Sequence, residues 1–365
     1  MVETTVQLAS TTLAGRPPLS HANPGFLTRM GYYAKTYIFR HVLEFLPPYN
    51  LLLRPIPASS APTLQKAYPI LPGYPHRMFL PSSYTLQLGD DQSAALPQLP
   101  ILVAFHPGGF SSMSPRHLDE FCHYMANKFQ LFVISANYRK APAFQFPIPV
   151  HDAAAVVRAI IDDDSPELQH GDRTKVAVCG FSCGANLAMA LCQLPALRNA
   201  DGSHVVRGVA GFYGNYEVAT DAHKKIAVSG KGAEAFETFL IPELSRINWI
   251  YAPDPADALN PLASPFFAKR ADLPQCLYII SCERDLLWPE ANVMSERLAK
   301  EEGRKRVELL GGWKQGGVRW ELLSGVGHSY DSLTTKGKEE EALRKRVFES
   351  MCDNVASWLK NEVFI

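Results

Sequence analysis

Residues 175–187 read Lys-Val-Ala-Val-Cys-Gly-Phe-Ser-Cys-Gly-Ala-Asn-Leu, and they set the interpretation of the rest of the chain. The apolar run 176–179 predicts a strand, and the alanine- and leucine-rich run from residue 185 predicts a helix. Between them, Ser182 is flanked by Gly180 and Gly184. On such a sharp turn a serine is strained and projects its hydroxyl from the sheet, while side chains at both glycines would meet backbone. The pattern predicts a nucleophilic Ser182; a turn without chemistry is the alternative.

The composition is that of an ordinary soluble globular protein with enough apolar residues for a large core. Lys plus Arg and Asp plus Glu both number 36, so the formal charge is zero. This balance gives no electrostatic reason to expect nucleic acid or an anionic membrane as a partner. The seven cysteines form no CxxC pair and several lie in apolar runs. They predict buried free thiols in a reducing compartment, which favours a cytoplasmic location.

No transmembrane segment is expected. The most apolar early segment, residues 30–53, is interrupted by charged residues and by Pro47-Pro48. The first five residues lack the basic start and apolar core of a signal peptide. Loose contact of an amphipathic face with a membrane stays open as an alternative. The sequence makes no prediction of the oligomeric state.

From residue 100 onward, strand patterns alternate with helix patterns, which predicts an α/β fold. Strands are expected at 101–105, 131–136, 176–179, 205–212, 276–281 and 318–323, and helices at 115–129, 150–161, 290–302 and 339–361. Such alternation implies a mostly parallel central sheet with helices on both faces. Weak strand signals precede it at 76–80 and 84–88. The basic, glycine-rich stretch 303–317 is expected to be a surface loop.

The expected domain organisation is a core interrupted by a cap. Residues 1–75 form an N-terminal cap and wrapping segment with a helix at 28–46, and residues 76–214 form the first part of the core. The alternation then breaks, so residues 215–273, with a helix at 233–250, are expected to be a cap insertion. Residues 274–365 complete the core. The cap should lie over the carboxyl ends of the strands, where open α/β sheets bind ligands.

A nucleophilic serine needs a base and an orienting acid. His328 follows the strand expected at 318–323, so it should lie at the same sheet edge as Ser182. Asp285 follows the strand expected at 276–281 and lies between them in the chain order serine, acid, histidine. Glu283 is the competing acid, and chain order leaves both open.

An oxyanion hole is expected in the loop after the strand 101–105, which reads His106-Pro-Gly-Gly-Phe110. Glycines allow the backbone to approach a substrate carbonyl, so the N–H groups of Gly108 and Gly109 are the candidate donors. The N–H of Cys183, directly after the nucleophile, would be a third donor.

With these residues in place, the chain resembles the hormone-sensitive-lipase-like group of α/β-hydrolases, which includes family IV esterases and arylacetamide deacetylase-like enzymes. The group's His-Gly-Gly-Gly and Gly-Asp-Ser-Ala-Gly-Gly-Asn motifs are similar to residues 106–109 and 180–186. Its Tyr-Arg-Leu-Ala-Pro-Glu motif resembles residues 138–143, and its acid motif resembles 283–286, which favours Asp285. The departures are Pro107, Phe181 and Ala143, which put substrate preference in question more than reaction type.

The resemblance implies the α/β-hydrolase fold with a helical cap and a carboxylesterase-type serine hydrolase. Ser182, His328 and Asp285 would form its triad, and no cofactor or metal ion would be needed. We expect a small to medium hydrophobic ester as substrate. Aromatic residues are the candidates to line its pocket: Phe110, Phe181, Tyr213, Phe239 and Trp249. The alternatives are acyl transfer or tailoring in secondary metabolism, and a non-catalytic small-molecule receptor, against which the presence of His328 argues.

Overall fold

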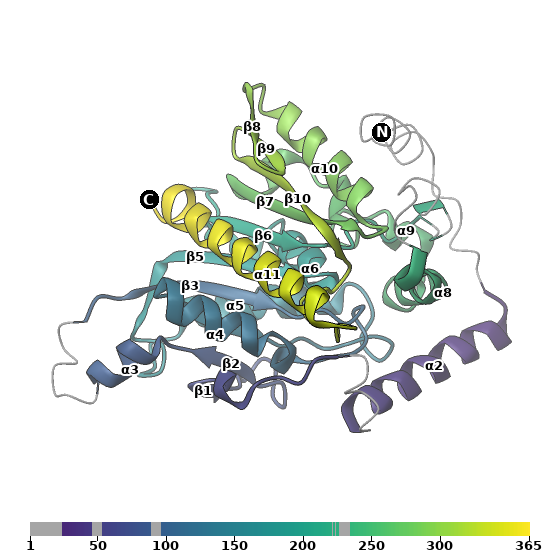
Figure 1. Ribbon diagram of the computed structural model, residues 1–365, viewed down its shortest axis with the longest axis horizontal. Coiled ribbons are helices and arrows are strands. Elements are labelled where there is room, and N and C mark those ends of the chain that lie inside the picture. The colour runs from purple at the N-terminus through teal and green to yellow at the C-terminus, as the bar shows by residue number, and fades with distance from the viewer. Residues whose placement is uncertain (1–23, 46–52, 89–95, 221, 223, 226–233) are drawn as a thin grey trace.

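The computed structural model describes residues 24–45, 53–88, 96–220, 222, 224–225 and 234–365, and these residues form a ten-stranded sheet (Figure 1). The strand order is β1-β2-β4-β3-β5-β6-β7-β10-β9-β8. Their bounds are β1 Leu64–Lys66, β2 His76–Phe79, β3 Leu99–Phe105, β4 Phe132–Ala136, β5 Gly171–Phe181, β6 Gly208–Phe212, β7 Cys276–Arg284, β8 Arg306–Leu309, β9 Gly312–Gln315 and β10 Val318–Gly327. The central strands from β4 to β10 are parallel, and the outer strands are antiparallel. The predicted mostly parallel sheet is confirmed.

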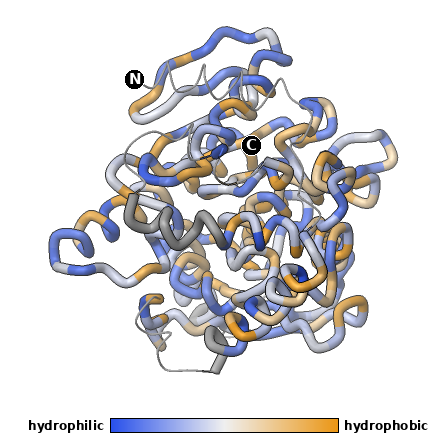
Figure 2. The backbone as a smooth tube through the Cα atoms, turned by 90° about the vertical axis from the view of Figure 1, so that its right-hand side faces the viewer, coloured by the Kyte–Doolittle hydropathy of each residue, from blue (hydrophilic) through white to orange (hydrophobic). Residues whose placement is uncertain are grey.

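Helices cover both faces of the sheet, as the sequence predicts. The α-helices described are α2 Phe26–Phe45, α3 Ser82–Leu88, α4 Asp119–Phe129, α5 Ile148–Asp162, α6 Cys183–Leu191, α8 Glu234–Tyr251, α9 Pro255–Ala258, α10 Trp288–Glu301 and α11 Lys338–Trp358. Strand β3 shows how the two cores form: Ile101 and Val103 pack with α5, α6 and α10, whereas Leu102 and Ala104 pack with α4 and α11. Successive side chains of a strand point to opposite faces, so each central strand contributes to both cores. Long hydrophilic stretches of the chain lie at the periphery (Figure 2).

The parallel register brings the ends of several strands to one edge of the sheet. Phe105 of β3 pairs with Gly180 of β5, and Phe181 pairs with Phe212 of β6. Phe212 pairs in turn with Ile280 of β7. The loops that follow these strands therefore start side by side, and these loops carry the residues that the sequence singles out.

Two local predictions are wrong. Residues 82–88 form helix α3 and not a strand, because Pro81 precedes the first turn and the N–H groups of Tyr84 and Thr85 bond back to its carbonyl. Residues 306–315 form a hairpin, β8 and β9, that extends the sheet beyond β10. Its Trp313 is buried against Trp320, with ring centroids 6.3 Å apart. The basic and glycine-rich composition concealed this alternating pattern.

Helices α2 and α8 pack together on one side of the molecule (Figure 1). Trp249 of α8 contacts the rings of Tyr32 and Tyr33 of α2 at 5.5 and 5.9 Å. Arg40 of α2 donates to the carbonyl of Ser111, 2.7 Å away, and so ties this pair to the core. Parts of the proposed cap segments lie outside the described residues, and their boundaries remain a proposal. Among the helices described, none combines the length and hydrophobicity needed to cross a membrane.

Candidate active site

Ser182 stands at the turn between β5 and α6 in a conformation that few non-glycine residues adopt. Its φ is +54° and its ψ is −118°. A Cβ at Gly180 would collide with the carbonyl of Gly184, and a Cβ at Gly184 would collide with the carbonyl of Phe105. The turn is therefore possible only with glycine at both positions, as the sequence predicts. The strain of ~1–3 kcal/mol typical of such a conformation is compensated by the surrounding packing.

The structure brings Ser182, His328 and Asp285 together in one hydrogen-bonded line. The Nε2 atom of His328 lies 2.9 Å from the Ser182 hydroxyl, and its Nδ1 atom lies 2.7 Å from Oδ2 of Asp285. An ionised carboxylate can only accept, so Nδ1 carries the proton and Nε2 is left to accept from the serine. All three residues are buried. A base in this tautomer can take a proton from Ser182.

The competing acid, Glu283, is placed elsewhere. It is exposed, and its Oε2 accepts the N–H of Gly325 at 2.8 Å, so it braces the end of β10. In contrast, Asp285 uses Oδ2 for His328 and Oδ1 for the N–H of Leu287 at 3.0 Å. Both oxygens are held, which fixes the carboxylate toward the imidazole.

The loop after β3 has the backbone shape that an oxyanion hole needs. Gly108 and Gly109 have φ angles of +121° and +59°. The carbonyl of Gly108 is turned into a local bend, where it accepts the N–H groups of Ser111 and Ser112. Among the bonds of the described residues, neither glycine donates its own N–H to a backbone carbonyl, and that of Gly109 faces the sulfur of Cys183. Cys183 is the first residue of α6, so its N–H has no partner within the helix.

Tyr138 supports this loop from behind, a role that the sequence did not reveal. Its hydroxyl donates to the carbonyl of His106 at 3.0 Å, and its ring stacks on the His106 imidazole at 4.5 Å. Burial holds the pKa of His106 well below its usual range, so the ring stays neutral. Burial also raises the pKa of the Cys183 thiol. The thiol therefore stays neutral and lies 3.6 Å from the Tyr138 hydroxyl, while the oxyanion role of the Cys183 N–H stays a prediction.

Helix α8 packs against the loop 106–110, which follows β3 and holds the proposed oxyanion donors. Ile247 is so close to Gly109 that a Cβ there would come within 2.8 Å of its Cδ1 atom. Tyr251 stacks on Phe110 at 3.7 Å, with the two rings nearly parallel. Phe110, predicted as a pocket residue, is fully buried beneath Tyr251, and its contact with substrate stays a prediction. The contact of Ile247 has no signal in the sequence.

The other predicted pocket residues divide into three cases. Trp249 is buried between α8 and α2. The side chain of Phe239 lies outside the described residues. Phe181 points to the α4 and α11 face, where it stacks on Phe212 at 4.3 Å and meets Phe121 edge-on. The alternation of β5 forces this direction, so Phe181 packs in the core under the turn and the geometry does not support its contact with substrate.

Tyr213 lies beside the histidine. Its ring centroid is 5.0 Å from that of His328, and its hydroxyl donates to Oδ1 of Asp331 at 2.6 Å. Asp331, three residues after His328, was not singled out by the sequence. Through these contacts Tyr213 packs against His328 and is itself held by Asp331, which fits a supporting residue better than a residue that lines a substrate pocket.

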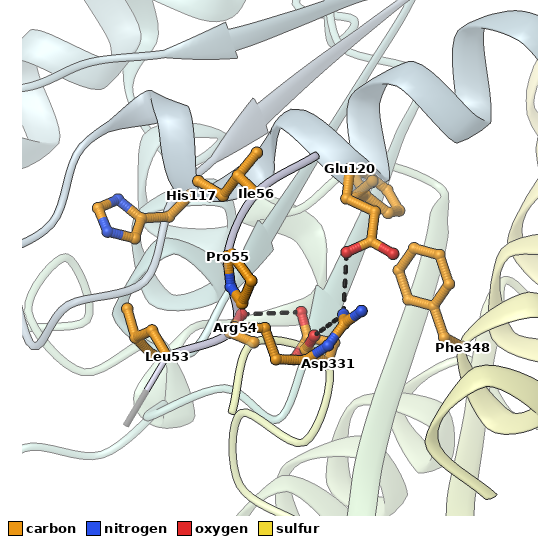
Figure 3. Close-up of a pocket in the computed structure, with 10 residues that line it drawn as sticks. Leu53, Arg54, Pro55, Ile56, His117, Glu120, Asp331 and Phe348 are labelled. Atoms are coloured by element: carbon orange, nitrogen blue, oxygen red, sulfur yellow. Dashed lines mark hydrogen bonds and ion pairs between the residues drawn. The ribbon is translucent and has the colours of Figure 1, made fainter. Parts of the chain in front are cut away.

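A small pocket lies beside Asp331, in the loop that follows β10 and carries His328 (Figure 3). Its volume of about 30 Å³ suits a single water molecule. Arg54, Glu120 and Asp331 line it, whereas Ser182, His328 and Asp285 do not. It is therefore separate from the triad. Within the described residues, no group of three or more His, Cys, Asp or Glu side chains could hold a metal ion.

A family model described as an alpha/beta hydrolase fold matches residues 102–313. Tuliposide B-converting enzyme 1 of Tulipa gesneriana is 26% identical over 308 residues, which are 80% of this chain and 62% of that enzyme. Carboxylesterase NlhH of Mycobacterium tuberculosis is 33% identical over 96 residues, 26% of this chain and 30% of that one. The matches thus span less than two thirds of either relative.

Among solved structures, an esterase of Pyrobaculum calidifontis superposes with a TM-score of 0.63. It is 20% identical and the match covers 99% of both chains. At this identity the likeness concerns the fold alone.

Proposed function

This chain belongs to the α/β-hydrolase fold family, whose model matches residues 102–313, and on that basis we propose that it hydrolyses carboxylic esters through a Ser-His-Asp acyl-enzyme mechanism. The observation that carries the proposal is the line of two hydrogen bonds from Ser182 through His328 to Asp285. The family's name alone would not specify an activity, because one fold serves many functions.

In the first half-reaction, Nε2 of His328 takes the Ser182 proton as Oγ attacks the ester carbonyl. Asp285 keeps Nδ1 protonated and stabilises the imidazolium that forms. The carbonyl oxygen becomes negatively charged and accepts the N–H groups of Gly108, Gly109 and Cys183. His328 then gives its proton to the leaving alcohol, and Ser182 is left acylated.

In the second half-reaction, water enters the place of the alcohol. His328 removes one proton from this water as its oxygen attacks the acyl carbon, and a second tetrahedral oxyanion forms. Collapse of that intermediate returns the proton to Ser182 Oγ and releases the carboxylic acid. No step requires a group beyond these residues and water.

The expected substrate is a neutral ester with a small to medium hydrophobic acyl group. The apolar side chain of Ile247 over Gly109 and the stacked rings of Phe110 and Tyr251 support this class, since they place apolar surface next to the oxyanion loop. The names of the relatives, which include a carboxylesterase, support ester chemistry.

The test is a p-nitrophenyl ester series from acetate to palmitate with Ser182→Ala as control. We expect turnover that is highest for short and medium chains and falls on the order of 10⁶-fold in kcat in the variant, as in other serine triads. A fluorophosphonate probe should label the wild-type protein and not the variant. Retention of more than about a tenth of the activity in Ser182→Ala would exclude this nucleophile, since that residue supplies the bond to the acyl group.

A further inference from the structure

The ring of Tyr213 lies against the imidazole of His328. Tyr213 follows β6 directly, with φ of +38°, and its N–H donates to the carbonyl of Ile280 at 2.7 Å. Its ring meets the imidazole edge-on, with an interplanar angle of 64° and centroids 5.0 Å apart. A bulky residue with positive φ is strained, so this backbone conformation needs support from its surroundings.

Asp331 provides that support from the loop that carries His328. Its Oδ1 accepts the Tyr213 hydroxyl at 2.6 Å, and its Oδ2 lies 3.3 Å from the hydroxyl of Ser332. The carboxyl is buried, and burial raises its pKa, while the hydrogen bond from Tyr213 opposes this rise. The phenol therefore joins the end of β6 to the histidine loop through a charge-assisted bond.

The same loop is held from outside by the N-terminal segment. The Arg54 guanidinium donates to the carbonyl of Asp331 at 3.3 Å and to Glu120 at 3.0 Å, as Figure 3 shows. The backbone N–H of Arg54 donates to the carbonyl of Ser332 at 2.9 Å. The loop is thus fixed on both sides of Asp331, which leaves the carboxylate little freedom to move away from Tyr213.

From this geometry we propose that Tyr213 and Asp331 are positioning residues for His328: the Asp331 carboxylate fixes the Tyr213 phenol, and the phenol ring holds the imidazole in line with Ser182 and Asp285. The inference rests on the proposed function, because it assigns a task within the same site. Position matters here because a misplacement of about 1 Å in a reacting group can lower the rate by about 10²-fold.

Asp331 also adds a second negative charge near the base. The titratable and charged groups around it come from the N-terminal segment, α4, β7, α11, the end of β6 and its own loop: Arg54, Glu120, Cys282, Arg344, Cys352, Tyr213, Tyr330 and His328. The two permanently positive groups among these are each paired with a glutamate, Arg54 with Glu120 at 3.0 Å and Arg344 with Glu341 at 2.7 Å. The Asp331 carboxylate is bonded to the hydroxyls of Tyr213 and Ser332.

The experiment uses the full chain and three substitutions. Tyr213→Phe removes the hydroxyl and keeps the ring, and Asp331→Asn removes the charge and keeps the shape. Tyr330→Phe is the matched control, because this buried tyrosine lies on the same loop and donates to Met351 Sδ, not to a group of the site. With p-nitrophenyl butyrate we expect kcat to fall about tenfold in either test variant, with KM changed less than about twofold. The control should keep the wild-type kcat.

The double variant shows whether the two residues act as a unit. If they do, the double variant of Tyr213→Phe and Asp331→Asn should lose no more activity than the less active of the two single variants. The reason is that each single substitution already breaks the shared bond. Losses that multiply would overturn the proposal, and so would test variants with kcat within about twofold of wild type. Should Asp331→Asn fail to fold, Tyr213→Phe and its control still decide the outcome.

The NMR signals of the His328 ring protons give a readout that needs no turnover. With His328→Gln used to assign them, these signals should shift at one fixed pH in Tyr213→Phe and in Asp331→Asn, because the phenol ring, whose centroid is 5.0 Å from that of the imidazole, changes its position when its bond to Asp331 is lost. They should stay unchanged in Tyr330→Phe. A protein that neither turns over esters nor reacts with the fluorophosphonate contradicts the proposed function, whereas an active wild type whose His328 signals do not shift in either test variant contradicts this inference alone.

Discussion

Ile247 of α8 rests on Gly109, in the loop after β3, so closely that an added Cβ at Gly109 would lie 2.8 Å from the isoleucine Cδ1. Helix α8 therefore meets the core at the residue whose N–H is proposed to bind the developing oxyanion. A change on α8 can alter the rate without touching the triad. The contact also makes the glycine necessary for two reasons, its φ of +59° and the space it leaves.

Gly109→Ala should lower kcat by on the order of 10²-fold, because relief of the contact with Ile247 shifts the N–H away from the substrate oxygen. Adding Ile247→Ala in the same chain should restore about tenfold of that loss. Gly73→Ala is the matched control: it also has a positive φ, of +82°, and nothing lies within 4 Å of its Cβ direction. Steady-state kinetics on one p-nitrophenyl ester measure all four proteins. No rescue by Ile247→Ala would mean that the contact does not set the geometry of the loop.

The two acids near β7 should behave very differently when their charge is removed. Asp285→Asn should lower kcat by on the order of 10⁴-fold, since an amide no longer holds the tautomer that leaves Nε2 free to accept. Glu283→Gln keeps an oxygen for the N–H of Gly325 and should lower kcat less than about tenfold. Comparable losses in the two variants would contradict the assignment of Asp285.

The core of the fold was predictable because its signals are local and repeat along the chain. The apolar strands before Ser182, Asp285 and the oxyanion loop gave the parallel sheet, and glycine spacing gave the turn. The hairpin of β8 and β9 was missed because the stretch 303–317 holds nine arginines, lysines and glycines and four apolar residues, so its alternation is hard to see. Helix α3 was missed because Tyr84, Leu86 and Leu88 also fit the alternation of a strand.

The site was predictable where motif and chain order coincide, as for Ser182 and His328. What the sequence could not provide is the direction of side chains between distant segments. Phe181 precedes the nucleophile, but the pleat of β5 turns it into the core. Tyr213 and Asp331 are 118 positions apart in the chain and have no shared motif. Such pairs are set by the packing of whole strands and loops, which no local pattern encodes.

Loss of the Arg40 side chain should loosen α2 from the core. Arg40 donates to the carbonyls of Ser111 and Ala141, so Arg40→Gln leaves two carbonyls without a charged donor. Hydrogen bonds to a charged group contribute about 1.5–3 kcal/mol each when buried. Because Arg40 is partly exposed, we expect a total loss of stability of about 1.5–3 kcal/mol for the two bonds together. Limited proteolysis should cleave within α2 faster than in wild type. Lys35→Gln, on the exposed face of the same helix, is the control and should leave the cleavage rate unchanged.

The last prediction concerns stability at acid pH and the histidine at the start of β2. His76 is buried; its Nδ1 accepts the N–H of Asn137 at 3.0 Å, and burial lowers its pKa to about 4. The unfolded chain binds this proton near pH 6.5, so between about pH 6.5 and 4 the unfolded state holds more protons than the folded state. The folding stability that depends on a neutral His76 ring is therefore complete above pH 6.5 and is lost as the pH falls.

Urea unfolding of wild type should show about 2 kcal/mol less stability from this residue at pH 5 than at pH 7. His76→Asn, which keeps an acceptor for Asn137, should flatten the decline by that amount, and His151→Asn, at an exposed position, should not. Equal declines in wild type and His76→Asn would show that His76 takes up its proton without unfolding the chain.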